Sequence, residues 1–325
     1  MTRTFRFAAA LLALAASLLA FDAPAQPYPN KQVRWVVGYP AGGGTDFLAR
    51  TAGAQLSQQL GQPVVIDNRP GAAAIIASEH VARSPGDGYT VFSADNGVLV
   101  YNPALYKKLP YEAEKDFALL GMMGRSSLVI TAAPNAGFAD AKALLAELKR
   151  SPGKYSVATP GLGSPHHLAL ELFQREAGVS VLHVPYKGGA PALQDLMGGQ
   201  VPLMVLDLPS GVSAVKAGKA IPLIAMSGER MPQLPNVQTA RELGFPAVEA
   251  YAWQGLVAPA ATPKEVQTRL GADLMKAMND PGVRQKLQDA GWDPTPADAA
   301  EMTRYTEAER KKWHALIKAR DIKLD

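Results

Sequence analysis

Short apolar runs alternate with segments of helical spacing along most of the chain. The first run, residues 33–37, precedes a glycine-rich turn and a segment at 45–60 that places Leu48, Ala52, Leu56 and Leu60 on one helical face. The same alternation gives strands at 64–66 and 89–93 around a helix at 72–83. Strands that alternate with helices are typical of an α/β fold with largely parallel sheets.

A second series of the same kind follows. It consists of helices at 139–150, 165–177 and from about 191 and 209, with strands at 155–159, 181–184, 202–206 and 221–226. The apolar runs 117–123, 128–132 and 251–260 predict further strands that connect the two series. We therefore predict a two-lobed α/β protein of the periplasmic binding type, with two parallel or mixed sheets flanked by helices and a ligand cleft at the hinge. The predicted lobes are 26–125 with 251–325, and 126–250.

The C-terminal part shows two signals for helix starts. Residues 262–265, Thr-Pro-Lys-Glu, match a capping box with proline at the first helical position. Thr295 and Pro296 repeat the threonine-proline signal before a long helix to about residue 319. These helices have no sheet of their own, so we expect them to return to the first lobe.

The first 25 residues have the pattern of a secretory signal peptide. Arg3 and Arg6 precede an apolar run, and Ala23-Pro24-Ala25 forms an A-x-A cleavage site. We expect cleavage after Ala25 and export to the periplasm. Because the chain has no cysteine, Cys-ligated metals, attached haem and thiol chemistry are excluded.

The charge of the chain gives little evidence for a nucleic-acid partner. The formal net charge is only +4, and no aromatic residues interleave the basic group at 310–312. We expect no nucleic acid among the partners, although a mild positive charge is compatible with attracting anions.

The glycine-rich segment at 38–46, GYPAGGGTD, does not match a phosphate-binding P-loop. That motif requires Lys and Ser/Thr where this chain has Thr45 and Asp46. The second glycine turn, around Gly161 and Gly163, meets only half of the dinucleotide fingerprint, because His166 stands at the third glycine position. The Ser hydrolase elbow G-x-S-x-G is absent there as well. Nothing in these motifs predicts a cofactor or a catalytic residue.

Two pairs of adjacent residues could be interpreted as a metal site and as a catalytic Tyr-Lys pair, but we favour neither interpretation. His166 and His167 are adjacent, and Glu171 lies four residues after His167 on the same helix face. No H-E-x-x-H motif is present, so a single polar contact is a better expectation than a metal site. Tyr186 and Lys187 are adjacent on a turn and point apart, which indicates a structural turn.

One physical pattern occurs twice: a strand, a glycine-bearing turn and a helix N-terminus. Glycine lets a ligand approach the backbone, and the first amides of a helix lack internal partners and favour negative charge. Residues 42–45 and 161–164 each fit this description, with Thr45 and Ser164 adding hydroxyls. Two such turns facing across a hinge predict a clamp for a small anion, although turns of this kind between a strand and a helix are commonly simple tight turns. Asp46 either caps its helix or contacts the ligand.

The chain resembles, over nearly its whole mature length, the Bug family of periplasmic solute receptors of tripartite tricarboxylate transporters. The resemblance rests on an ordered set of motifs that includes PAGGGTD at 40–46, LGQPVVIDNRPGA at 60–72, NPALYKKLPY at 102–111, HVPYKGGAPALQDLMGGQV at 183–201 and WQGLVAPAATP at 253–263. It implies a receptor without catalytic activity that closes over a small carboxylate, such as a di- or tricarboxylate, an amino acid or an aromatic acid. It also implies integral membrane transporter subunits as partners, and we expect a monomer.

The resemblance also implies the binding residues. The first-lobe wall comprises Tyr39, Ala41, Gly42, Gly43, Gly44, Thr45 and Asp46, with Ala94, Asp95 and Asn96 after the third strand. The second-lobe wall comprises Gly163, Ser164, His167, Tyr186 and Asp207. Ser164 is expected to donate to a ligand carboxylate, and Asp207 to orient water or accept from a ligand donor.

Asp95 departs from the usual family pattern, in which small neutral residues are more typical. A buried, unpaired carboxylate beside an anion would be costly. We therefore expect Asp95 to point to solvent, the alternatives being a ligand with a cationic or donating group and a turn-forming Asp-Asn-Gly.

Two other functions remain open. A receptor of this kind can report its ligand to a sensor kinase and transport nothing. A hydrolase that uses Ser164 with a nearby histidine is less favoured, because no complete nucleophile, base and orienting residue is evident.

Overall fold

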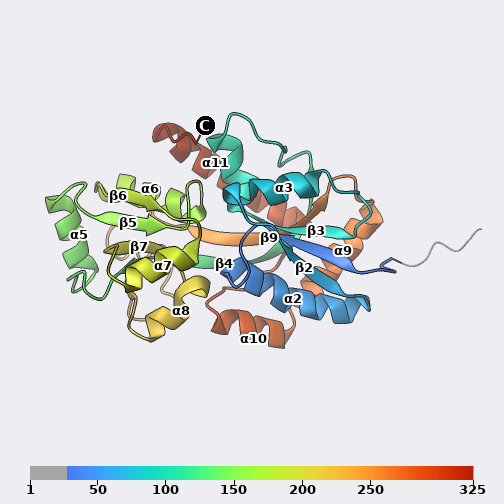
Figure 1. The fold of residues 1–325 in the computed structure, drawn as a ribbon, viewed down its shortest axis with the longest axis horizontal. Helices are drawn as coiled ribbons and strands as arrows, with labels where there is room; N and C mark the ends of the chain where they lie inside the picture. Colours follow the sequence, from blue (N-terminus) through green and yellow to red (C-terminus); the bar gives the residue numbers. More distant parts are fainter. Residues whose placement is uncertain (1–27, 325) are drawn as a thin grey trace, which may run out of the picture. The chain divides into compact units, whose positions relative to one another are not determined.

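The computed structural model describes residues 28–324, and its compact unit begins at Lys31 (Figure 1). The predicted signal peptide, residues 1–25, lies outside the described residues. Within 28–324, no helix is long and apolar enough to cross a membrane.

The chain begins with two strand-helix units. These are β1 (Val33–Val37), α2 (Gly44–Leu60), β2 (Val64–Asn68), α3 (Ile75–Ala82) and β3 (Thr90–Asp95), followed by a π-helical turn at Gly97–Tyr101 and α4 (Asn102–Leu105). A long strand, β4 (Phe117–Ala132), leads into the second series. That series comprises α5 (Ala141–Arg150), β5 (Ser156–Thr159), α6 (Pro165–Ala177), β6 (Leu182–Pro185), α7 (Gly189–Met197), β7 (Leu203–Asp207), α8 (Leu208–Lys216) and β8 (Ile221–Ala225). The chain ends with β9 (Tyr251–Pro259), α9 (Lys264–Met278), α10 (Pro281–Asp289), β10 (Ala297–Asp298) and α11 (Ala299–Ala319).

The strands form one continuous path in the order β2-β1-β3-β9-β4-β7-β5-β6, with β8 and β10 pairing with β4 off this path. The pairs of β1 with β2 and β3, and of β5 with β6 and β7, are parallel. β9 and β4 run antiparallel to their neighbours and join the two parallel groups. The predicted mixed α/β architecture with two groups of strands is therefore confirmed.

The runs 117–123 and 128–132 belong to a single strand, β4, which we had predicted as two. Its pairing with β9 shifts register between Leu119 and Gly121 and again between Met122 and Gly124. It continues without a break into its pairing with β7, where Leu128 faces Asp207. β4 therefore pairs with β9 at one end and with β7 at the other, and so lies between the two parallel groups. The predicted lobe boundaries at 125 and 251 remain a prediction.

Helices cover both faces of the β1–β3 group, with α2 and α10 on one side and α3 and α11 on the other (Figure 1). The predicted apolar face of α2 is buried, and Gly61 ends the helix in the left-handed conformation. α9 and α10 both pack on α2. The C-terminal helices thus contribute to the half of the sheet that contains the N-terminal strands.

Three local predictions were wrong. Residues 72–74 do not form the first turn of the predicted α-helix at 72–83, because all three alanines have positive φ. α3 begins only at Ile75. Asn102 Nδ2 and Ser78 Oγ hold this turn through the carbonyls of Ala73 and Ala74.

The two C-terminal capping signals also fail. Thr262 makes no cap hydrogen bond, since Pro263 occupies the N-cap position of α9. The last helix begins at Ala299, because Ala297 and Asp298 pair with β4 and the Asp298 side chain caps the helix by accepting from Glu301 N. Tertiary pairing thus moved the helix start away from the local threonine-proline signal.

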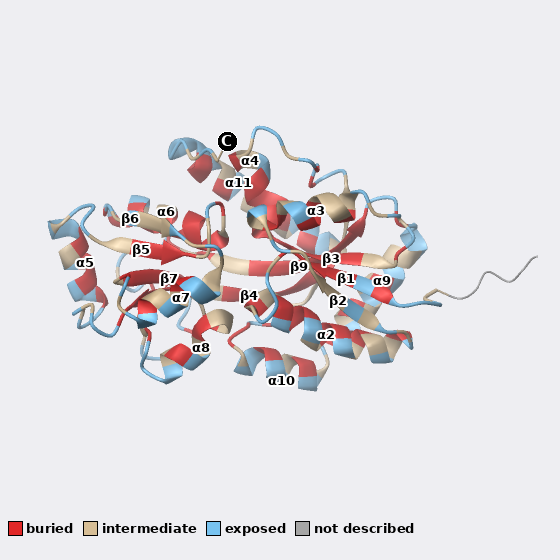
Figure 2. Cartoon of the chain, viewed as in Figure 1, coloured by how far each residue is buried: buried red, intermediate tan, exposed pale blue. Residues whose placement is uncertain are grey.

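The core fills the space between the strands and the inner faces of the helices (Figure 2). Trp35 is fully buried on β1, and its indole donates to Ser93 Oγ at 2.8 Å. Trp313 of α11 packs edge-on against Tyr101 with ring centroids 5.2 Å apart. These contacts fix the strand ends from which the candidate binding turns begin.

Candidate functional site

The first glycine turn leads from β1 into the N-terminus of α2. Gly42 has φ of 83°, a conformation that side chains disfavour, and Gly43 occupies the N-cap position without any side-chain cap. The amides of Gly44 and Thr45 are the first of the helix and have no internal partner by geometry. They are two donors without intrahelical partners at the positive end of a 17-residue helix.

Asp46 holds this turn together. Its Oδ2 accepts from Gly42 N and from Arg50 Nε, both at 2.9 Å, and its Oδ1 accepts from Asn68 Nδ2 at 2.9 Å. Burial alone would raise the pKa of Asp46, but the hydrogen bonds from Arg50, Gly42 N and Asn68 outweigh it and lower that pKa. Asp46 is therefore a structural acceptor, and the Gly42 amide that we expected to bind a ligand is already engaged.

Thr45 has a partner that the sequence did not reveal. Gln254 Nε2 on β9 donates to Thr45 Oγ1 at 3.0 Å. Gln254 thereby orients the Thr45 hydroxyl, which keeps its own proton, and no described residue accepts that proton. Gln254 is 3% exposed, and the only signal for it was a polar residue inside an apolar strand run.

Asp95 at the end of β3 does not point to solvent, as we had expected, since it is 3% exposed. Its carboxylate accepts from Tyr39 OH and from the amides of Gly97 and Val98. Burial raises the pKa of Asp95 while these hydrogen bonds oppose the shift. Burial, followed by the charge of Asp95, also raises the pKa of Tyr39 well above its ordinary value.

The segment around Asp95 is not the left-handed turn that its Asp-Asn-Gly sequence favours. Asn96 is right-handed helical, with φ of −62°, and a π-helical turn begins at Gly97. The Asn96 side chain donates to Tyr101 OH and to the Tyr251 carbonyl. Ala94 is fully buried in β3. Residues 94–96 of the predicted wall thus stabilise the ends of the strands. Ala41, on the first glycine turn, is exposed.

The second glycine turn leads from β5 into α6, with Ser164 as the N-cap. Ser164 Oγ accepts from His167 N and donates to Gly161 O at 2.7 Å. The expectation that Ser164 donates to a carboxylate is therefore not met in this geometry, because its proton is already used. The Gly163 amide is likewise engaged, donating to His167 Nδ1 at 3.2 Å.

His167 stacks face to face on His183 with centroids 4.3 Å apart. Burial lowers the pKa of His167 to about 4, and burial together with His167 lowers the pKa of His183 to about 4. Both rings are therefore neutral at pH 7. Since His167 Nδ1 accepts from Gly163, its Nε2 carries the proton.

The Asp207 side chain contacts residues of both α6 and α8. Its Oδ1 lies 2.8 Å from His166 Nε2, and its Oδ2 accepts from both the amide and the hydroxyl of Ser210. Burial alone would raise the pKa of Asp207, but these contacts outweigh it and lower that pKa. His166 makes one polar contact, as we expected. The described residues contain no cluster of three side chains that could hold a metal ion.

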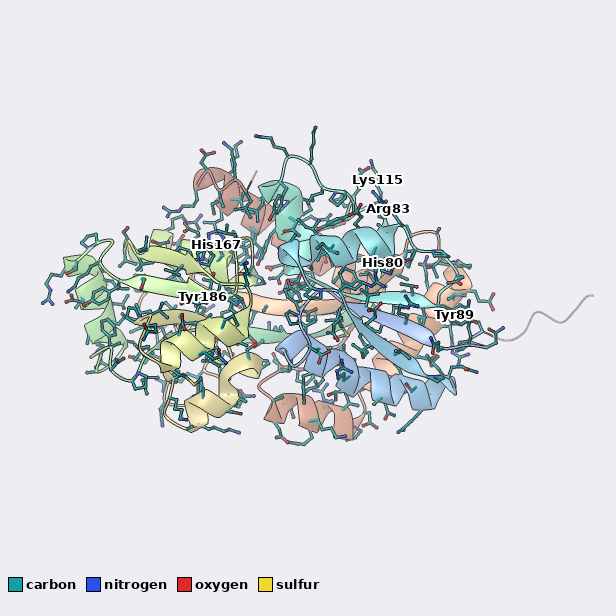
Figure 3. The ribbon with its side chains drawn as sticks, in the orientation of Figure 1. His80, Arg83, Tyr89, Lys115, His167 and Tyr186 are labelled. Atoms are coloured by element: carbon teal, nitrogen blue, oxygen red, sulfur yellow. The ribbon has the colours of Figure 1, made fainter. Side chains whose placement is uncertain are left out.

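Tyr186 donates its hydroxyl to Asp195 at 2.7 Å, away from the glycine turn. Burial, followed by Asp195, raises the pKa of Tyr186 to about 12. Its carbonyl lies 3.4 Å from where a Cβ on Gly161 would stand, so its backbone borders the second turn. His167 and Tyr186 both lie in the half that contains β5 to β7 (Figure 3).

The structure brings the first turn against α8. A Cβ placed on Gly44 would stand 2.9 Å from Pro209 Cβ, 3.5 Å from Asp207 Oδ2 and 3.6 Å from Trp292 Cζ2. Gly163 instead borders Leu105 and Leu324. The part of the β5–β7 half that lies beside Gly44 at the α2 N-terminus is thus the turn between β7 and α8. We had predicted that the 161–164 turn would face it across the cleft.

Comparison with known proteins identifies the family. The model of the family described as "Tripartite tricarboxylate transporter family receptor" matches residues 48–322. Protein BugT of Bordetella pertussis is 31% identical over 312 residues, which are 96% of each chain.

Solved structures show the same fold. An R. palustris protein solved with adipate is 33% identical, with a TM-score of 0.86 over 90% of this chain and 97% of the other. MatC from Rhodopseudomonas palustris, solved with bound malate, is 30% identical, with a TM-score of 0.83 over 89% of this chain and all of the other.

Proposed function

Because this chain belongs to the family of tripartite tricarboxylate transporter receptors, we propose that it captures a small dicarboxylate at the N-terminus of α2. The observation that carries the proposal is the donor set there: the amides of Gly44 and Thr45, which lack intrahelical partners, and the Thr45 hydroxyl, which Gln254 orients. Three donors at a helix N-terminus suit a carboxylate without a lysine or arginine. The fold, which this chain shares with the periplasmic binding protein BugD, agrees with this role.

The choice of a dicarboxylate over an amino acid rests on Asp95. A ligand ammonium group would need an anionic acceptor, and the Asp95 carboxylate is already occupied by Tyr39 and by the amides of Gly97 and Val98. Asp46 and Asp207 are occupied in the same way. The relatives solved with adipate and malate support the same ligand class.

A hydrolytic role has no support from the site. The Ser164 hydroxyl donates to a carbonyl, and His167 Nδ1 accepts an amide proton, so neither is placed as nucleophile and base. We therefore propose a receptor without catalytic activity, whose partners are the membrane subunits of a transporter. Its predicted leader, cleaved after Ala25, would deliver it to the periplasm, and the lobes 26–125 with 251–325 and 126–250 would close on the ligand.

Thermal unfolding of the exported protein with succinate, malate, adipate, aspartate and benzoate tests the ligand class. A dicarboxylate at 100 times its dissociation constant should add about 2.7 kcal/mol to the free energy of unfolding. Stabilisation by aspartate alone would contradict the assignment.

A matched pair of variants tests the site. Thr45→Val removes the hydroxyl with little change in shape, and Thr51→Val makes the same change further along α2. A hydrogen bond to a charged group is worth about 1.5–3 kcal/mol, so Thr45→Val should weaken binding by about ten- to a hundredfold. Thr51→Val should leave the dissociation constant unchanged, and equal effects of the two variants would refute the placement.

A further inference from the structure

A cavity of about 470 Å³ lies between β4, β10 and α11. Its lining residues are Met122, Arg125, Thr295, Pro296, Ala297, Glu301, Arg304 and Tyr305. None of these residues belongs to the two glycine turns. The volume is in the range of sites that hold small molecules.

Two guanidinium groups reach this cavity from different elements. Arg125 comes from β4, where it pairs with Asp293 at 2.9 Å and lies 4.2 Å from the Tyr251 ring centroid. Arg304 comes from α11, and within residues 28–324 no carboxylate forms an ion pair with it. Glu301 is the one acidic residue in the lining. The Asp293 side chain is 53% exposed, and such surface pairs are weak, so a bound anion can compete for Arg125.

The remaining lining combines an apolar wall with hydroxyl groups. Met122, Pro296 and Ala297 are apolar, and the Tyr305 ring is fixed edge-on against Trp253 at 5.5 Å. No described residue hydrogen-bonds the Tyr305 hydroxyl, and the buried Thr295 hydroxyl also lacks a partner within the described part of the chain. Guanidinium forks bind carboxylates in two-point fashion, and the apolar wall suits a carbon body attached to the charge.

We propose that this cavity is a second binding site, selective for a small organic carboxylate and separate from the site at the α2 N-terminus. Arg304 and Arg125 bind the carboxylate, Tyr305 donates a hydrogen bond to it, and Met122 and Pro296 contact its apolar part.

The segment 291–297 connects the two sites. Trp292 Cζ2 lies 3.6 Å from where a Cβ on Gly44 would stand, at the α2 N-terminus. Asp293 binds Arg125 through both its side chain and its backbone, and Thr295 begins the cavity lining. A carboxylate that displaces Asp293 from Arg125 therefore acts on a residue adjacent to Trp292. Occupancy of the cavity is expected to change the dissociation constant measured at the α2 site.

The test uses 4-bromobenzoate, a carboxylate with an apolar body, and calorimetric titration of the exported protein. Arg304→Gln should weaken binding about tenfold, and Tyr305→Phe by a few fold, because each removes a donor to the charged group. Lys311→Gln is the matched control, since it removes an exposed positive charge from the same helix outside the cavity lining. It should leave the affinity unchanged. Anomalous scattering from bromine in a crystal should place the probe beside Arg304.

The outcomes separate this site from the first one. Binding in the cavity should persist in Thr45→Val, which alters only the α2 site. Bromine found only at the α2 N-terminus, or equal effects of Arg304→Gln and Lys311→Gln, would overturn the proposal. Displacement of the probe by an equal concentration of inorganic phosphate would overturn the selectivity for carboxylates. Tighter binding of a hexaglutamate peptide than of the probe would indicate a protein-docking surface instead.

Discussion

The lack of space for a Cβ between Gly44 and Pro209 predicts that one added methyl group weakens ligand binding. Gly44 has no positive φ and is the first residue of α2, so alanine fits its backbone. The new Cβ would stand 2.9 Å from Pro209 Cβ, whereas carbon atoms pack best at about 3.5–4.0 Å. The N-termini of α2 and α8 must then move apart by roughly 0.6–1.1 Å, given that packing distance.

Overpacking of this kind costs about 1–3 kcal/mol. We expect this close approach of α2 and α8 to form when the receptor closes on its ligand, so the cost appears in binding and not in folding. The dissociation constant of Gly44→Ala for the stabilising dicarboxylate should then rise by about five- to 150-fold. Isothermal titration calorimetry measures this change, and urea unfolding of the free protein should show no loss of stability.

A second substitution separates closure from direct blocking of the ligand. Pro209→Gly removes the Cβ that the new methyl group would meet. The double variant should recover most of the affinity lost in Gly44→Ala, measured against Pro209→Gly alone. A double variant that stays as weak as Gly44→Ala would refute the reasoning, because the methyl group would then be obstructing the ligand itself.

Three further predictions concern positioning, pH and backbone strain. Gln254→Leu should weaken dicarboxylate binding, because it removes the hydrogen bond that orients the Thr45 hydroxyl. The same substitution should have little further effect in the Thr45→Val background, which calorimetry of a double-mutant cycle measures. The folded-state pKa values of His167 and His183, about 4, lie below the usual 6.5, so their stabilisation is complete above pH 6.5 and is lost as the pH falls toward 4. Urea unfolding between those pH values should show a steeper loss in the native protein than in His183→Gln. Ala72 has a φ of 46°, which glycine tolerates better than alanine, so Ala72→Gly should raise the free energy of unfolding by about 0.5–1 kcal/mol. Ala308→Gly, inside α11, should lower it by about 1 kcal/mol. Urea unfolding measures both changes, and the same sign for the two variants would contradict this reasoning.

The alternation of strands and helices could be predicted because it depends on local periodicity. The apolar face of α2 and its end at Gly61 follow from spacing and from the left-handed conformation that glycine tolerates. Where a local signal competed with pairing to a distant strand, the pairing prevailed. Thr295 has the sequence of a helix cap, but residues 297–298 pair with β4 and Asp298 caps the helix instead.

The sequence by itself determined the α/β class, the family and the position of two glycine turns before helix N-termini. Only the tertiary structure decided which donors at those turns stay open. Asp46 uses the Gly42 amide, Ser164 gives its proton to Gly161, and Gln254 reaches Thr45 across 209 residues of chain. The physical reason is that periodicity records which face of an element is buried, whereas the availability of a hydrogen bond depends on partners that only folding brings within 3 Å.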